Sequence, residues 1–264
     1  MLLHRVITSL ILLLLTYLVF FQAPDRVFVV AITLFFAVGV YELLRMYKSL
    51  KYINIYITII FIIISLLLNF TQYDISQVVR FVSVALWCFV APFILIAQPK
   101  KFHLLIILLL AFLVFGLASY SLVILHDALG VWQLLSIMSV AWVGDIGAYF
   151  VGRKFGRHKL APNISPGKSI EGALAGMALV IIYLSILKYF NLAIYLYSYV
   201  AVLKFGIILV IAGIIGDLFE SWLKRVAGVK DSGTILPGHG GVFDRVDSLL
   251  AVLAIAFAMI RGLL

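Results

Sequence analysis

Apolar runs of about 20 residues recur along the whole sequence, and each is long enough for one membrane-spanning helix. A helix that crosses the hydrocarbon core of a bilayer needs roughly 17–25 mostly apolar residues. About nine runs meet this requirement, at 6–21, 27–44, 52–70, 79–97, 102–125, 130–151, 170–190, 200–222 and 248–264. The pattern predicts an all-α, polytopic integral membrane protein with about nine transmembrane helices.

Composition excludes a soluble globular protein. Hydrophobic residues make up 65% of the 264-residue chain and charged residues 12%, against roughly 45–50% and 25% in soluble domains. Water could not solvate the apolar surface of such a chain, whereas lipid could. We expect a single integral membrane unit, with N-terminal helices over 1–130 and a region carrying the polar motifs over 131–264.

The net charge of +9 is explained by membrane orientation and not by a nucleic-acid partner. Fifteen of the 20 Lys and Arg residues fall on one side of the predicted spans, mainly in two polar loops near 152–171 and 223–247. Cytoplasmic loops carry such an excess, so both loops are expected in the cytoplasm, with the protein in the cell membrane. Four basic residues near span ends are expected to reach the headgroups: Arg80, Lys188, Lys204 and Arg261.

Acidic residues concentrate in the second half of the chain. Seven of the 11 lie in or beside the two polar loops, or at helix ends that lead into them: Asp145, Glu171, Asp217, Glu220, Asp231, Asp244 and Asp247. The other four are scattered and are expected at the membrane interface: Asp25, Glu42, Asp74 and Asp127. An ionisable group in a membrane is costly and usually functional. For Asp145, a hydrogen bond to a neighbouring helix is the structural alternative.

Asp217, Glu220 and Lys224 are spaced to lie on one face of a helix, with Ser221 nearby. An ordinary Glu220–Lys224 pair would satisfy two of these side chains. It would not account for Asp217, because a carboxylate in an apolar segment needs a cation or a basic side chain.

The segment 230–247 contains basic residues and a glycine-rich turn that is followed by two carboxylates. Three glycines around His239 let backbone amides approach an anion closely. Asp244 and Asp247 then open the last predicted helix, where capping is the alternative role for one of them. Mg²⁺ is commonly held by one or two carboxylates together with substrate phosphates, so the segment predicts a magnesium–phosphate site.

The other polar loop contains residues 167–169, Gly-Lys-Ser, which match the last three positions of the P-loop motif. That motif requires glycine where Pro162 stands, and no strand precedes it, so a Walker site is excluded. Ser165, Lys168 and Ser169 still supply donors at a predicted helix start, which is a natural anion site.

Two further patterns are interpreted as structural. Gly172 and Gly176 form a GxxxG pattern that predicts close helix packing. His239 has no Cys or His companion at zinc spacing, and the other histidines are isolated and expected at the interface: His4, His103, His126 and His158.

The most specific pattern extends from Ser221 to Asp247. It reads Ser221-x-Leu223-Lys224-Arg225, four residues, Lys230-Asp231-x-Gly233, then Leu236-Pro237-x-His239-Gly240-Gly241-Val242-x-Asp244-Arg245-Val246-Asp247. This segment resembles the signature of phosphatidate cytidylyltransferases (CDP-diacylglycerol synthases). Upstream stretches around Gly144-Asp145 and from Ile164 to Gly172 are also similar to this family, so the resemblance covers about the C-terminal half.

The resemblance implies transfer of a cytidylyl group from CTP to phosphatidic acid in the lipid bilayer, by a homodimer that uses Mg²⁺. A second cation is a further candidate cofactor. The resemblance places the metal-binding acids at Asp217 and Asp244. Asp145 and Asp231 are further metal candidates by their position in the chain, and their alternative roles are support of a metal ligand or helix capping. The candidate catalytic residues are Asp217, Asp244, Lys224, Arg225, Lys230, Arg245 and Asp247. The candidate substrate-binding residues are Ser165, Lys168, Ser169, Glu171, Ser221, His239, Gly240 and Gly241.

Two other classes compete with this interpretation. A cation-coupled transporter places its site near the midplane between broken repeats, whereas here the charges gather at one face. A phosphatidyltransferase that consumes a CDP-lipid carries a spaced DG…AR…G…D…D pattern, which is absent from this sequence.

Overall fold

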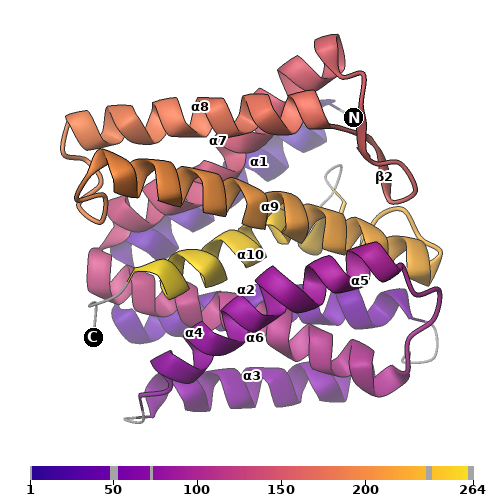
Figure 1. Cartoon of the computed structure of the whole chain (residues 1–264). Coiled ribbons are helices and arrows are strands. Elements are labelled where there is room, and N and C mark those ends of the chain that lie inside the picture. Colours follow the sequence, from indigo (N-terminus) through magenta and orange to yellow (C-terminus); the bar gives the residue numbers. More distant parts are fainter. Residues whose placement is uncertain (1, 48–52, 72–73, 236–239, 261–264) are drawn as a thin grey trace. The chain divides into compact units, whose positions relative to one another are not determined.

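The computed structural model describes residues 2–47, 53–71, 74–235 and 240–260, and these form helices almost throughout (Figure 1). The elements in chain order are α1 (Leu2–Tyr17), the π-helical η1 (Leu18–Gln22), α2 (Asp25–Met46), α3 (Asn54–Phe70), α4 (Ser76–Val84), the π-helical η3 (Ala85–Val90), α5 (Ala91–Ala97), α6 (Leu104–Leu129), α7 (Val131–Phe155), β1 (Lys159–Ala161), β2 (Ser165–Ser169), α8 (Ile170–Tyr189), α9 (Tyr199–Ala227) and α10 (Phe243–Met259). The predicted all-α class is confirmed.

Six described helices are long and apolar enough to cross a membrane: Asp25–Met46, Ser76–Ala97, Leu104–Leu129, Val131–Phe155, Ile170–Tyr189 and Tyr199–Ala227. Two further apolar helices are shorter, Ser9–Gln22 and Asn54–Phe70, so the predicted count of about nine is not confirmed. Large apolar side chains such as Phe81, Phe93 and Ile96 are exposed. An apolar surface of this kind is stable against lipid, and the chain is a multi-pass membrane protein.

The helical segment Ser76–Ala97 changes its winding in the middle. Residues Ala85–Val90 are π-helical, and Pro92 follows at the start of α5. Proline has no N–H to donate and its ring clashes with the carbonyl four residues earlier, here that of Cys88. A wider local turn avoids this clash, which accounts for the π segment at this position.

The chain divides into two compact units whose segments alternate along the sequence. Unit 1 comprises Met1–Ile75, Pro99–Ile124 and Leu223–Val246, and unit 2 comprises Ser76–Gln98, Leu125–Trp222 and Asp247–Leu264. Three helices, α6, α9 and α10, therefore contribute residues to both units.

In unit 1, α2 packs against α3, and a group of buried aromatic rings fills the core. The rings of Phe115 and Phe243 meet edge to face with centroids 5.1 Å apart. Gly39 on α2 faces the ring of Phe115 so closely that a side chain there would collide with it. The start of α10 is therefore anchored in the core of unit 1 by an aromatic contact.

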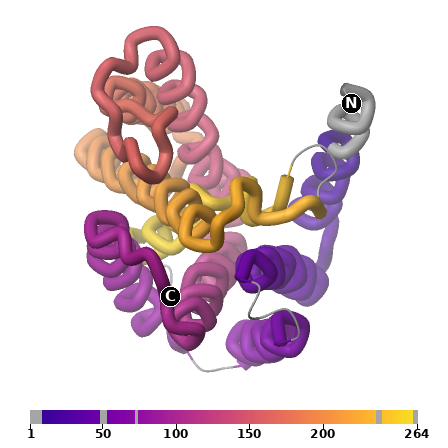
Figure 2. The backbone as a smooth tube through the Cα atoms, turned by 90° about the vertical axis from the view of Figure 1, so that its right-hand side faces the viewer, coloured from indigo at the N-terminus to yellow at the C-terminus, as the bar shows by residue number. Residues whose placement is uncertain are grey.

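In unit 2, α7 and α8 lie side by side, joined by the β1–β2 hairpin drawn in red (Figures 1 and 2). Glycines make this close approach possible: a Cβ on Gly176 would lie 2.5 Å from the carbonyl oxygen of Gly144, and one on Gly172 would lie 2.8 Å from that of Ala148. Small residues of this kind let helix backbones come together in a membrane. The packing role predicted for the GxxxG pattern is confirmed.

Gly176→Ala is expected to destabilise the protein by about 1–3 kcal/mol, because the added methyl group must push α7 and α8 apart. The thermal midpoint of the purified protein in detergent measures this effect. Gly167→Ala is the matched control, since nothing lies within 4 Å of a Cβ at that position. Equal midpoints for the two variants would contradict the packing role.

Arg80 contacts the C-terminal end of α10. Its Nη1 donates hydrogen bonds of 2.7 Å to the carbonyl oxygens of Phe257 and Ile260, and its guanidinium lies 4.3 Å from the ring centroid of Phe257. The last carbonyls of a helix have no partner within the helix, so Arg80 caps the C-terminal end of α10.

Candidate active site

Three acids gather in unit 2. Asp217 and Glu220, one turn apart on α9, and Asp247 on α10 each offer a carboxylate oxygen within 4.8 Å of the others. Gly216 allows this meeting, because a Cβ there would lie 2.6 Å from the backbone oxygen of Asp247. The sequence predicted Asp217 and Asp247 as site residues, and the fold brings their side chains together with that of Glu220.

The charge of this cluster fits a cation site. Two carboxylates 4.8 Å apart repel each other by roughly 3 kcal/mol at an effective dielectric constant near 20. A positive charge is already present, since Nζ of Lys168 lies 2.5 Å from Oδ2 of Asp217. Ser221 also donates a hydrogen bond of 3.3 Å to Oδ1 of Asp217. A divalent cation held by several carboxylate oxygens would satisfy the cluster further.

Lys168 reaches this cluster from the hairpin between α7 and α8. The strands pair antiparallel, with Lys159 opposite Ser169 and Ala161 opposite Ser165. Ser169 then caps α8, its Oγ accepting a hydrogen bond of 3.2 Å from the N–H of Gly172. The helix start predicted here from sequence is confirmed, and it fixes the position from which Lys168 extends.

Glu171 and His158 hold the base of the same hairpin. Nδ1 of His158 lies 2.6 Å from Oε1 of Glu171, and the N–H groups of Arg157 and His158 donate to the same carboxylate at 3.2 Å. The expectation that His158 is isolated was wrong. Its partner lies 13 residues away in sequence, beyond the reach of local spacing rules.

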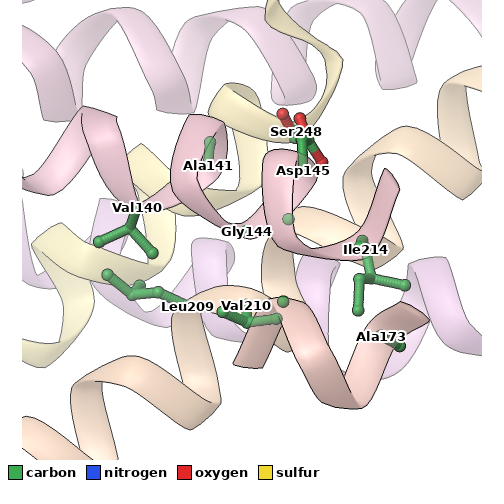
Figure 3. A pocket seen from close by; sticks show the side chains of 12 residues that line it. Val140, Ala141, Gly144, Asp145, Ala173, Leu209, Val210, Ile214 and Ser248 are labelled. Carbon is green, nitrogen blue, oxygen red and sulfur yellow. The ribbon is translucent and has the colours of Figure 1, made fainter. Parts of the chain in front are cut away.

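Asp145 on α7 lines a cavity of about 30 Å³ in unit 2 (Figure 3). Most of the lining is apolar or small, and Ser248 is the other polar side chain in it. Asp145 and Ser248 are drawn together in Figure 3, at one side of this space.

Asp244 is the centre of a hydrogen-bonded group in unit 1. Its Oδ1 lies 2.8 Å from Nζ of Lys224, in a pair whose side chains are only 12% and 15% exposed. Its Oδ2 accepts hydrogen bonds from the N–H of Gly241 at 2.9 Å and from the N–H and Oγ of Ser232, both at 3.0 Å. The glycine-rich turn was predicted to bind an anion, and in the structure the N–H of Gly241 in this turn donates to the carboxylate of Asp244.

Glu42 is the functional candidate that sequence reasoning missed. It was expected at the membrane interface, but its side chain is buried and accepts a hydrogen bond of 2.9 Å from the N–H of Phe243. Its partners lie about 200 residues along the chain. No local spacing could have connected them, although a lone acid in the apolar run 27–44 was itself a signal.

The remaining predicted residues differ in their exposure. Those with exposed side chains are Arg225, Lys230, Asp231 and Arg245. Ser165 is partly buried in β2, and Gly240 adopts the left-handed region with φ of 85°. His239 lies outside the described residues, as does Arg261.

A family model described as the cytidylyltransferase family matches residues 3–263. The chain belongs to the cytidylyltransferase family. The match includes residues 3–130, where sequence reasoning found only a run of membrane helices, and it confirms the resemblance seen in the C-terminal half.

Curated proteins that are similar to this chain carry the name phosphatidate cytidylyltransferase. The Haemophilus influenzae protein is 44% identical over 129 residues, 48% of this chain and 45% of the relative. The Thermotoga maritima protein is 40% identical over 146 residues, 54% of each. The Bacillus subtilis protein is 33% identical over 232 residues, 85% of each. The chain spans about half the length of the first two relatives and most of the third.

Proposed function

We propose that this protein transfers the cytidylyl group of CTP to phosphatidic acid, giving CDP-diacylglycerol and pyrophosphate. The observation that carries the proposal is the likeness to the Bacillus subtilis phosphatidate cytidylyltransferase, which extends over 85% of both chains. The polar groups of the two units fit a reaction between two phosphate compounds, since both combine carboxylates with lysine side chains.

The reaction needs no strong general base. Phosphatidate is a phosphate monoester with a second pKa of about 6, so it is mostly dianionic at neutral pH. One of its oxygens forms a bond to the α-phosphorus of CTP, and the bond from that phosphorus to the bridging oxygen breaks as pyrophosphate leaves. The chain must bring two polyanions together, so its residues act by positioning and by charge neutralisation.

Mg²⁺ is the cation that we propose for the acids, and it would neutralise charge on the CTP phosphates and on the leaving pyrophosphate. In unit 2, Asp217, Glu220 and Asp247 would hold it. The family resemblance proposes Asp244, which belongs to unit 1, as a metal-binding acid as well, and Asp145 and Asp231 are the candidates for a second cation.

Basic and hydroxyl side chains of the two polar loops would bind the phosphates. Lys168 and Ser169 do so from the hairpin, and Lys224 does so beside Asp244. Exposed side chains would contribute further contacts to phosphate oxygens: Arg225, Lys230 and Arg245. Glu171 is engaged with His158, which supports a role in holding the hairpin.

The cellular setting follows from the charge distribution. We propose that both polar loops face the cytoplasm of a cell membrane, because fifteen of the 20 basic residues lie on that side of the predicted spans. CTP then arrives from water and phosphatidate from the bilayer. A homodimer is proposed from the family resemblance.

Purified protein in detergent is expected to convert CTP and phosphatidate to CDP-diacylglycerol and pyrophosphate in equal amounts when Mg²⁺ is present. Removing Mg²⁺ with EDTA should lower the rate by roughly 10³-fold or more, because the charge of the leaving pyrophosphate is then not neutralised. Adding Mg²⁺ back should restore the rate. Release of CMP from a CDP-lipid would instead identify a phosphatidyltransferase, and sided solute uptake without CTP turnover would identify a transporter.

A further inference from the structure

Glu42 connects helix α2 to Ser232 and to the start of α10, where Asp244 lies. It lies on α2 near its C-terminal end, and its side chain is 1% exposed. Its Oε2 accepts a hydrogen bond of 2.9 Å from the N–H of Phe243, the first residue of α10, and one of 3.2 Å from Oγ of Ser232. A buried carboxylate is unfavourable unless such donors meet it, so Ser232 and the helix start are its partners.

Ser232 joins Glu42 to Asp244. Its Oγ lies 3.2 Å from Oε2 of Glu42 and 3.0 Å from Oδ2 of Asp244. A hydroxyl carries a single proton, so it can donate fully to one of these two carboxylates at a time. The two acids therefore share one donor, and a change at Glu42 is felt at Asp244 through Ser232.

Two glycines are closely fitted around the carboxylate of Glu42. A Cβ on Gly241 would lie 2.5 Å from Oε2 of Glu42, and one on Gly233 would collide with Oε1. The same helix also supports the ring of Phe243 through Phe115, which contacts Gly39 one turn before Glu42. Helix α2 thus determines both the backbone and the side-chain position of Phe243, next to Asp244.

We propose that Glu42 is a positioning residue that holds Ser232 and the start of α10 so that the carboxylate of Asp244 and the N–H of Gly241 keep their arrangement. Glu42 acts through Ser232 and Phe243 and makes no contact with substrate in this role. The effect of a Glu42 variant on turnover rests on the function proposed above. Its effect on amide exchange at Ser232, Gly241 and Phe243 does not rest on that function, so the two effects are measured separately.

The positioning role is tested by amide hydrogen exchange of the full-length protein in detergent, with mass spectrometry as the detection method. Glu42→Ala removes the acceptor, so amide exchange in peptides that cover Ser232, Gly241 and Phe243 is expected to rise about tenfold or more. Glu42→Gln keeps an acceptor oxygen in place, so its exchange should stay within about threefold of the wild-type protein.

Thr33→Val is the matched control for these variants. Thr33 is also fully buried on α2, and its Oγ1 lies 3.4 Å from Oγ of Ser65. It lies nine residues before Glu42, about 13 Å along the helix axis. This variant removes a buried polar contact from the same helix and should leave exchange at Ser232, Gly241 and Phe243 unchanged.

Turnover of CTP and phosphatidate is the second measurement. Glu42→Ala should lower kcat roughly 100-fold, as expected when a catalytic group is misplaced by about 1 Å, with KM for phosphatidate little changed. Glu42→Gln should retain most of kcat. If the wild-type protein makes no CDP-diacylglycerol, the proposed function fails, and the exchange experiment alone decides the role of Glu42.

An unchanged amide exchange rate at Ser232, Gly241 and Phe243 in Glu42→Ala would overturn the proposal. An equal increase of this rate in Thr33→Val would overturn it as well. If Glu42→Ala gives no folded protein, Ser232→Ala decides, because it removes only the shared hydroxyl. Faster exchange at Gly241 and Phe243 in that variant supports the proposal, and unchanged exchange contradicts it.

Discussion

Asp217→Asn is expected to lower kcat for CDP-diacylglycerol synthesis roughly 10³-fold, equivalent to about 4 kcal/mol of transition-state stabilisation. Asn has the size of Asp but lacks its charge, so the cluster with Glu220 and Asp247 loses a strong cation ligand. Lys168 also loses the carboxylate 2.5 Å from its Nζ. Initial rates of pyrophosphate release across a series of Mg²⁺ concentrations measure the effect.

The stability of Asp217→Asn should respond differently from its activity. One of three mutually repelling carboxylates is removed at the same time as an ion pair, and the two changes oppose each other. The thermal midpoint measured in EDTA is therefore expected to change little. Asp127→Asn is the control, since it makes the same chemical change at an exposed acid of the same unit. Wild-type turnover in Asp217→Asn would remove this residue from the proposed metal site.

Asp244→Asn is expected to lower kcat roughly 10²–10³-fold. Both oxygens of Asp244 accept hydrogen bonds, from Lys224, Ser232 and Gly241. An amide nitrogen in place of one oxygen would face these donors with another donor, so part of the network must break. Rate measurements at saturating CTP and phosphatidate, together with amide exchange at Ser232, Gly241 and Phe243, measure the two consequences.

Asp25→Asn serves as the control for Asp244→Asn, because Asp25 is an exposed acid in the same unit. Lys224→Met removes the ion pair together with the phosphate contact proposed for Lys224, so the Mg²⁺ dependence of the rate is the measurement that separates the two residues. If Asp244 binds a cation, Asp244→Asn should need more Mg²⁺ to reach half of its maximal rate, whereas Lys224→Met should not. Wild-type rates in Asp244→Asn would exclude it from catalysis.

Local patterns predicted much of the local structure. The apolar runs predicted a helical membrane protein, because a bilayer requires helices of about that length and composition. The donors at 165–169 predicted the start of α8, which Ser169 caps. The spacing of Gly172 and Gly176 predicted a close helix contact, and α7 provides it. Each of these inferences depends on residues within one or two turns of each other.

The contacts that organise the candidate site depend on residues far apart in sequence. Glu42 reads as an ordinary interfacial acid in its own segment, and its partners Ser232 and Phe243 are about 200 residues away. His158 reads as isolated until the hairpin brings it to Glu171. The spacing along the helix predicts Glu220 as a partner of Lys224. In the structure, its carboxylate lies close to those of Asp217 and Asp247.

The sequence by itself determined the class of the protein, its family resemblance and the list of acids that are candidates for the site. The cost of placing apolar and charged groups in a membrane is set residue by residue, so it can be read along the chain. Only the tertiary structure decided which acids share a cluster and which acids accept hydrogen bonds from the chain. It also decided that a glutamate on α2 accepts hydrogen bonds from Ser232 and from Phe243, next to Asp244. Those partnerships depend on helix packing, and the energy of a carboxylate depends on the charges and donors that packing places within a few ångströms of it.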